Sequence, residues 1–194
     1  SIALADAAGI PTAAGTAWQG LFEIAKLRRG QKILIHAGAG GVGSFAIQFA
    51  RQTGAYVIAT ASGEGLETAR RLGADKVIDY RLQDFAKMVA DVDVVLDTIG
   101  GDTQLRSYGV LRAGGVLVAT SEPPDDALAK AQKVSAAFVF HTSDGERLRK
   151  VVEDIEVNAV QVLIDARTTP GEFGDAFQHQ ASGRARGKII VAMV

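Results

Sequence analysis

A short apolar run followed at once by closely spaced glycines constrains the fold of this chain more than any other feature. Residues 32–37 form the apolar run, and Gly38-Ala39-Gly40-Gly41-Val42-Gly43 follows with the spacing G-x-G-x-x-G. Apolar side chains then recur at helical spacing from Val42 to Ala50, and Gly54 stands where a left-handed C-cap would end a helix. A buried strand, a glycine turn and a helix in this order are typical of a dinucleotide-binding fold.

Each glycine of this loop has its own expected role. Gly38 permits the tight turn, Gly40 lets the backbone approach a pyrophosphate, and Gly43 lets the helix pack closely against the strand. Backbone N–H groups and the positive end of the helix dipole then face the phosphates. A merely flexible turn is the alternative interpretation of the same glycines.

The rest of the chain predicts a parallel sheet, because strand-like runs alternate with helical segments and hairpin turns of the Asn-Gly kind are almost absent. Strands are predicted at residues 32–37, 56–61, 76–79, 92–97, 115–119 and 136–140, with a helix at 64–72 that ends at Gly73. We therefore predict an α/β Rossmann fold, a doubly wound six-stranded parallel sheet in the order 3-2-1-4-5-6. A cofactor would lie where the strand order reverses.

The chain changes character after residue 140. Ser143 and Glu146 form a capping-box pair before an amphipathic helix, and Thr169-Pro170 with Glu172 marks a second helix start. Strand-like runs are predicted at 160–164 and 188–194. Because these pieces lie outside the alternation of strands and helices, they predict partial segments of a second lobe. The predicted units are residues 1–10 in that lobe, 11–140 as the Rossmann domain and 141–194 as a return segment.

The end of the second predicted strand bears on the choice of nucleotide. Residues 59–62 read Ala-Thr-Ala-Ser, and no carboxylate occurs before Glu64. A site for NAD usually places an acid here to hold both ribose hydroxyls, whereas an acid would repel a 2′-phosphate and Ser62 could donate to one. The sequence therefore favours NADP (NADPH). The missing acid also disfavours a methyltransferase, whose second strand commonly ends in a carboxylate for the adenosine ribose.

Composition sets limits on other functions. The chain has 194 residues with a net charge of -1, which does not suggest a nucleic-acid or membrane-surface partner. It contains no cysteine, so disulfides, thiolate metal sites and cysteine nucleophiles are excluded. No apolar run reaches the roughly 18 residues of a membrane span, and no basic start precedes an apolar signal core. A cytoplasmic location is the resulting expectation.

Several short sequence motifs follow one another along the chain, and their order is more specific for a protein family than any single motif. They are Ala14-Gly15-Thr16-Ala17-Trp18, residues 35–43, Leu72-Gly73-Ala74-Asp75-Lys76-Val77-Ile78-Asp79-Tyr80, residues 94–101, Gly114-Gly115 and Gly183-Arg184-Ala185-Arg186-Gly187-Lys188. In this order they resemble the medium-chain dehydrogenase/reductase superfamily, and within it the zinc-independent quinone oxidoreductase and enone reductase branch. The resemblance covers nearly the whole chain.

The resemblance implies a longer protein and a reaction. Members have a GroES-like substrate lobe mostly ahead of the nucleotide domain, so we expect the C-terminal portion of such an enzyme. The implied reaction is hydride transfer from NADPH to a quinone or an α,β-unsaturated carbonyl, and no catalytic residue can be assigned in this chain. Zinc-dependent relatives place a ligand at the position that matches Ala8, and alanine cannot bind zinc. No metal site is therefore expected.

The resemblance also implies the residues that bind the cofactor. Thr16 would lie near the nicotinamide, residues 39–42 would line the pyrophosphate, and Thr98 would lie near the adenosine half. Ser62 and Tyr80 match residues that approach the 2′-phosphate. One departure concerns charge: NADP-binding relatives often carry a lysine three residues after the serine, and this chain has Gly65. Arg70 or Arg184 would then have to supply the missing charge.

Other conspicuous side chains have structural interpretations. His36 beside the glycine loop is expected to be a hydrogen-bonded structural histidine, and Asp93 and Asp97 are expected to be strand ends rather than an acid pair. Trp18 is expected in the core or an interface.

Two further hypotheses concern function and assembly. A non-catalytic NADP-binding module or sensor is the alternative to an enzyme. Residues 136–140 predict an apolar edge strand, and exposed edges invite pairing with another chain. The resemblance implies dimers joined through this last strand, so a homodimer is expected.

Overall fold

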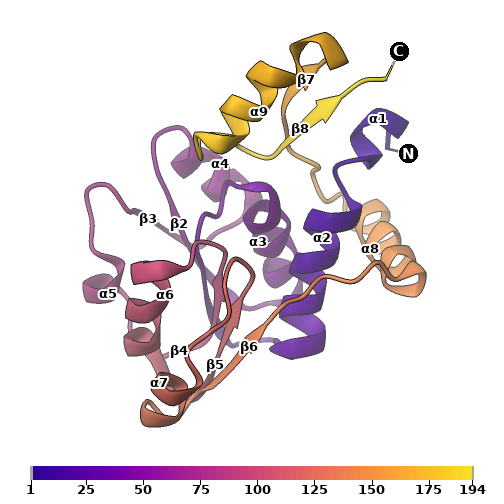
Figure 1. Cartoon of the computed structure of the whole chain (residues 1–194). Helices are drawn as coiled ribbons and strands as arrows, with labels where there is room; N and C mark the ends of the chain where they lie inside the picture. The colour runs from indigo at the N-terminus through magenta and orange to yellow at the C-terminus, as the bar shows by residue number, and fades with distance from the viewer. Residues whose placement is uncertain (1, 194) are drawn as a thin grey trace.

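A six-stranded parallel sheet forms the centre of the computed structural model, which describes residues 2–193 (Figure 1). The strands are β1 (Lys32–Ile35), β2 (Tyr56–Ala61), β3 (Lys76–Asp79), β4 (Val92–Asp97), β5 (Leu111–Ala119) and β6 (Ser135–Phe138). They lie in the order β3-β2-β1-β4-β5-β6, and every neighbouring pair is parallel. The predicted Rossmann fold and strand order are confirmed.

Helices cover both faces of the sheet because its central strands carry apolar side chains on both faces. In β1, Ile33 and Ile35 belong to one apolar cluster and Leu34 to the other. The first cluster is completed by α2 (Pro11–Trp18), α3 (Gly41–Thr53), α4 (Gly65–Leu72) and α8 (Gly145–Val157). The second includes residues of α5 (Phe85–Met88) and α7 (Asp126–Ala131), and α6 (Gly101–Ser107) lies beside these helices (Figure 1).

Three short elements complete this part of the chain. They are α1 (Leu4–Ala7), a π-helical turn η1 (Gln19–Ile24) that continues α2, and a 3-10 turn η2 (Tyr108–Val110) that continues α6. Trp18 lies at the junction of α2 and η1, with ring centroids 4.6 Å from Phe22 and 5.5 Å from Phe49. Trp18 is half-buried and packs against the first apolar cluster, which agrees with the expectation of a core or interface residue.

Glycines end two helices where the sequence places them. Gly54 after α3 has φ 79°, and Gly73 after α4 has φ 105°, so both adopt the left-handed conformation of a C-cap. Strand β1 stops at Ile35, earlier than the predicted residue 37, because Ala37 is itself left-handed with φ 49°. Strand β6 ends at Phe138 and not at residue 140, and β5 begins four residues before the predicted start, at Leu111.

The return segment differs from the prediction in its details. Asp144 and not Ser143 is the N-cap of α8, because its carboxylate accepts a hydrogen bond from the Arg147 N–H at 2.7 Å. The second helix start is confirmed: Thr169 and Glu172 form a capping box ahead of η3 (Pro170–Glu172) and α9 (Phe173–Ala181).

A two-stranded parallel sheet of β7 (Ile164–Thr168) and β8 (Lys188–Val191) closes the segment. Strand β7 replaces the predicted strand at 160–164. The Gln48 side chain holds the backbone of Gln161 instead, accepting from its N–H at 2.7 Å and donating to its carbonyl oxygen at 3.1 Å. Strand β8 is shorter than predicted, and Val194 lies outside the described residues.

Residues 2–10 lie against the return segment (Figure 1). Asp6 forms an ion pair with Arg167, and a Cβ placed on Gly9 would lie 3.3 Å from Cγ of Lys188. This proximity agrees with a common lobe for residues 1–10 and 141–194, although those boundaries stay a prediction and Ser1 lies outside the described residues.

No helix in the described part of the chain combines the length and the apolar character needed to cross a membrane.

Gly43 is expected to be essential for this packing, since a Cβ there would lie 2.3 Å from the Ala37 carbonyl oxygen. Gly43→Ala should lower the free energy of unfolding by about 1–3 kcal/mol, because the backbone must shift to admit the methyl group. Gly41→Ala is the matched control: its Cβ would meet the flexible Lys188 side chain at 3.1 Å and the Gly187 carbonyl oxygen at 3.5 Å, an ordinary van der Waals contact. Urea unfolding followed by circular dichroism measures both, and equal stability of the two variants would contradict the argument.

Candidate functional site

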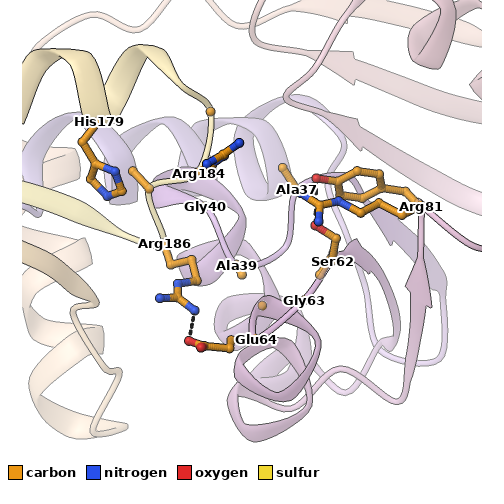
Figure 2. A pocket seen from close by; sticks show the side chains of 15 residues that line it. Ala37, Ala39, Gly40, Ser62, Gly63, Glu64, Arg81, His179, Arg184 and Arg186 are labelled. Carbon is orange, nitrogen blue, oxygen red and sulfur yellow. Dashed lines mark hydrogen bonds and ion pairs between the residues drawn. The ribbon is translucent and has the colours of Figure 1, made fainter.

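A cleft of about 450 Å³ lies beyond the carboxyl ends of β1, β2 and β3 (Figure 2). One wall comes from the Rossmann domain and contains Ala39 and Gly40 of the glycine loop, residues 61–65 after β2, and Tyr80 with Arg81 after β3. The other wall comes from the return segment and contains His179 and residues 183–186. The cleft therefore lies at the carboxyl ends of the strands, as predicted for a cofactor, but on the side of β1, β2 and β3. No residue of the turn that follows β4 lines it, so a position at the reversal between β1 and β4 stays a prediction.

The glycine loop is shaped by close packing. A Cβ on Gly38 would lie 2.8 Å from Cβ of Ala59 and 2.9 Å from Cδ1 of Ile47, so no side chain fits between the loop, β2 and α3. Gly38 does not have a positive φ; the left-handed residue of the turn is Ala37. The expected role of Gly38 is thus corrected: it is needed for space, and the turn itself is made one residue earlier.

The start of α3 is open to an anion. Gly40 is its N-cap, has an extended backbone with ψ 177°, and offers no side-chain hydrogen bond to the first N–H groups. Those N–H groups have no partner within a helix, and they lie at the positive end of its dipole. A Cβ at Gly41 would lie 3.1 Å from Cδ of Lys188, which shows that a lysine side chain reaches the same helix end. These residues fit a pyrophosphate.

Two hydroxyl groups meet at the ribose end of the cleft. The Ser62 hydroxyl donates to the Tyr80 hydroxyl oxygen at 2.9 Å, although the two residues lie on different strand ends. The Tyr80 N–H donates to the Ala61 carbonyl oxygen at 3.2 Å and so continues the pairing of β2 and β3 by one residue. The structure therefore brings together the two residues that the sequence assigns to a 2′-phosphate.

Three arginines line the cleft, and only one of them is paired within residues 2–193. Arg186 forms an ion pair with Glu64 across the cleft, shown as a dashed line in Figure 2. Arg81 and Arg184 have no carboxylate partner among the described residues. Arg70, one of the two arginines expected to supply charge, pairs with Glu67 at 3.4 Å and does not line the cleft.

The other predicted site residues do not line this cleft. Gly38, Gly41, Val42 and Gly43 are not among the residues that line it; Gly38 and Gly43 are buried. Thr16 is buried in α2, and the Thr98 hydroxyl donates to the His36 carbonyl oxygen at 2.9 Å. The proposed roles of these residues stay predictions.

Four residues that line the cleft were not assigned to it from the sequence: Arg81, Arg186, His179 and Glu64. A signal existed for Arg81, which directly follows Tyr80.

His36 is buried behind the glycine loop and does not reach the cleft. Its Nδ1 lies 3.2 Å from the Thr60 hydroxyl and its Nε2 lies 2.9 Å from the Ser107 hydroxyl. The pKa of His36 is lowered to about 4, mainly by burial; the Asp97 carboxylate opposes this shift and Arg106 adds to it. The ring is therefore neutral near pH 7, in agreement with a structural histidine.

Asp93 and Asp97 have separate structural tasks at opposite ends of β4. Asp93 accepts from the Lys32 N–H and from the Arg112 guanidinium, each at 2.7 Å. Partial burial acts to raise the pKa of Asp93, but these two hydrogen bonds hold it below its ordinary value. Asp97 is fully buried and accepts from the Ile99 and Gly100 N–H groups at 3.0 and 3.1 Å, which shapes the turn before α6. They form no acid pair, as expected.

The side chains described hold no group of three or more His, Cys, Asp or Glu residues placed to bind a metal ion.

The chain is similar to a protein-family model, to curated proteins and to solved structures. A family model described as zinc-binding dehydrogenase matches residues 72–191. The 2-methylene-furan-3-one reductase of Solanum lycopersicum is 37% identical over 98% of this chain and 47% of its own length. The NADPH-dependent alkenal/one oxidoreductase, chloroplastic, of Arabidopsis thaliana is 37% identical over 98% of this chain and 48% of its own.

Among solved structures, the quinone oxidoreductase from Coxiella burnetii superposes with a TM-score of 0.90. It is 32% identical, and the match covers 97% of this chain and 60% of that one. The chain therefore spans about half the length of the curated relatives that it matches.

The buried His36 should make stability depend on pH. Between its unfolded pKa of 6.5 and its folded pKa of about 4, the unfolded chain binds a proton that the folded chain excludes. The contribution of His36 is thus complete above pH 6.5 and is lost as the pH falls toward 4, by roughly 3 kcal/mol. His36→Asn, which keeps a polar group but cannot titrate there, should lose less stability over this range. Urea unfolding between pH 7 and 4 measures both proteins, and identical slopes would contradict the assignment.

Proposed function

The chain belongs to the zinc-binding dehydrogenase family of the medium-chain dehydrogenase/reductase superfamily, and we propose that it is the NADP(H)-binding portion of a zinc-independent oxidoreductase. The reaction we propose is hydride transfer from NADPH to a quinone or an α,β-unsaturated carbonyl. The observation that carries this proposal is the cleft that Gly40, the N-cap of α3, lines together with the Ser62–Tyr80 hydroxyl pair. The printed names of relatives with enone and quinone activities support the acceptor class.

Different residues of the chain would bind different parts of the cofactor. Residues 39–42 and the first N–H groups of α3 would bind the pyrophosphate, and Ser62 and Tyr80 would bind the 2′-phosphate. Thr16 is proposed near the nicotinamide and Thr98 near the adenosine half. When bound, NADPH supplies the hydride. His36 does not exchange a proton with it, since it is buried and neutral; it joins β1 to β2 and α6 through Thr60 and Ser107.

The second lobe is expected to complete the substrate pocket. Residues 1–10 and 141–194 are proposed as parts of that lobe, and the rest of it would lie in the portion of the relatives that this chain does not match. Positioning of the acceptor against the nicotinamide can contribute several kcal/mol to catalysis, and it needs both lobes. We therefore expect cofactor binding by this chain with little turnover.

A cytoplasmic location of the protein stays a prediction; one relative is named as chloroplastic.

A homodimer joined through β6 is proposed for the assembly. Strand β6 is the outermost strand of the sheet, and it follows β5 in parallel, which leaves one edge unpaired in the chain. Phe140, just beyond it, is 76% exposed. An exposed apolar edge strand favours pairing with a second copy. Light scattering of the purified chain at micromolar concentration measures its mass, and a monomer would contradict the proposal.

Turnover by the full-length enzyme tests the reaction. Oxidation of NADPH in the presence of 1,2-naphthoquinone, followed by absorbance, should be fast with the two-lobed protein and near background with this chain. Nucleotide binding by the full-length protein without turnover of any quinone or enone would instead support the alternative, a non-catalytic NADP-binding module. A methyltransferase is no longer an alternative, because the relatives are oxidoreductases.

Cofactor preference tests the ribose end of the site. The dissociation constant for NADPH should be about tenfold lower than that for NADH, equivalent to ~1.4 kcal/mol, because hydroxyl donors and no acid face the 2′-position. Ser62→Asp should reverse this order by adding a carboxylate that binds the ribose and repels the phosphate. Ser62→Ala, which removes the donor without adding charge, should only weaken the preference. Fluorescence titration measures all three proteins, and NADH binding as tight as NADPH binding in the unmutated chain would contradict the assignment.

A further inference from the structure

Residue 65, where the resemblance places a lysine in NADP-binding relatives, is a closely packed glycine. Gly65 is buried at the first position of α4, and a Cβ there would lie 3.0 Å from Cβ of Ala39 and 3.7 Å from Cβ of Ala61. A side chain at this position would require Ala39 of the glycine loop to give by a few tenths of an ångström. Because glycine has no side chain, a cation for the 2′-phosphate has to come from another element.

Arg81 is the cation that the structure places beside the two hydroxyl groups. It follows Tyr80 directly, after the end of β3, and it lines the same cleft as Ser62 (Figure 2). Its backbone is held by two hydrogen bonds: the Arg81 N–H donates to the Asp79 carboxylate at 3.0 Å, and the Tyr80 N–H donates to the Ala61 carbonyl oxygen at 3.2 Å. These bonds place Arg81 next to the hydroxyl pair within the chain itself.

The charges around Arg81 leave its guanidinium available. Asp79 uses its carboxylate on the backbone of the turn, and no ion pair to the Arg81 side chain occurs within the described chain. Glu64 is the acid that lines this cleft, and Arg186 pairs with it. Arg184, also unpaired, faces the cleft from the opposite wall in Figure 2. The electrostatic balance of the cleft thus favours an anion next to Ser62 and Tyr80.

We propose that Arg81 is the residue that determines the preference for NADPH, by pairing with the 2′-phosphate in place of the lysine that is absent at Gly65. The proposal rests on the proposed function, because it assigns a group to the same cofactor site. A guanidinium beside two hydroxyls forms charge-assisted hydrogen bonds to a phosphate dianion and none to a ribose hydroxyl of comparable strength. Arg81 therefore acts on NADPH and not on NADH.

Substitution of Arg81 separates this role from a general effect on binding. Arg81→Gln should raise the dissociation constant for NADPH about tenfold and change that for NADH less than twofold, and Arg81→Lys should restore most of the NADPH affinity. Arg70→Gln is the matched control, an exposed arginine that does not line the cleft, and it should leave both constants unchanged. Circular dichroism confirms that each variant is folded.

Fragments of the nucleotide distinguish failure of this proposal from failure of the proposed function. Adenosine 2′,5′-bisphosphate should bind Arg81→Gln about tenfold more weakly than the unmutated chain, while adenosine 5′-phosphate should bind both equally. If the unmutated chain prefers NADPH and Arg81→Gln keeps that preference, Arg81 is not the determinant. An equal loss for NADH and NADPH would also overturn the proposal, because it would indicate a positioning effect. If the unmutated chain binds neither nucleotide, the proposed function itself fails.

Discussion

The close approach of helix α3 to the turn after β1 is the constraint on which the rest of the site depends. Gly43 admits it, because any Cβ there would meet the Ala37 carbonyl oxygen at 2.3 Å. Gly38 admits the matching approach of β2, whose Ala59 lies within 2.8 Å of where a Cβ would be. As a result the positive end of α3 and the end of β2 open into one cleft. A wider spacing would separate the first N–H groups of α3, which are proposed to bind the pyrophosphate, from Ser62.

The second wall of the cleft comes from outside the Rossmann domain. Residues 183–186 lie between α9 and β8, and that segment is held in place by the small β7–β8 sheet. The Arg186–Glu64 ion pair then crosses the cleft, and His179 lies 2.5 Å from the Asp165 carboxylate behind it. The return segment therefore has two consequences: it narrows the site, and it neutralises the acid nearest to the ribose end.

Local patterns predicted most of the sheet because its strands are apolar on both faces and are separated by helices. Parallel strands joined by right-handed crossovers leave few possible orders, so the order could be inferred before any contact was known. No bounds were predicted from the sequence for helices α2, α6 and α7, which are all short: they span Pro11–Trp18, Gly101–Ser107 and Asp126–Ala131. Helix α6 also starts at a turn whose N–H groups are bound by the buried Asp97. Likewise Gln48 moves the start of β7 through its bonds to Gln161.

The sequence by itself determined the family, the Rossmann topology, the glycine loop and the hydroxyl groups of Ser62 and Tyr80. These features depend on residue type and on spacing along the chain, which are local. Only the tertiary structure decided that Ser62 and Tyr80 are in contact, that Arg81 shares their cleft while Arg70 does not, and that His36 is neutral. Each of these depends on how side chains from different elements pack and exclude water, and neither property follows from the order of residues in one element.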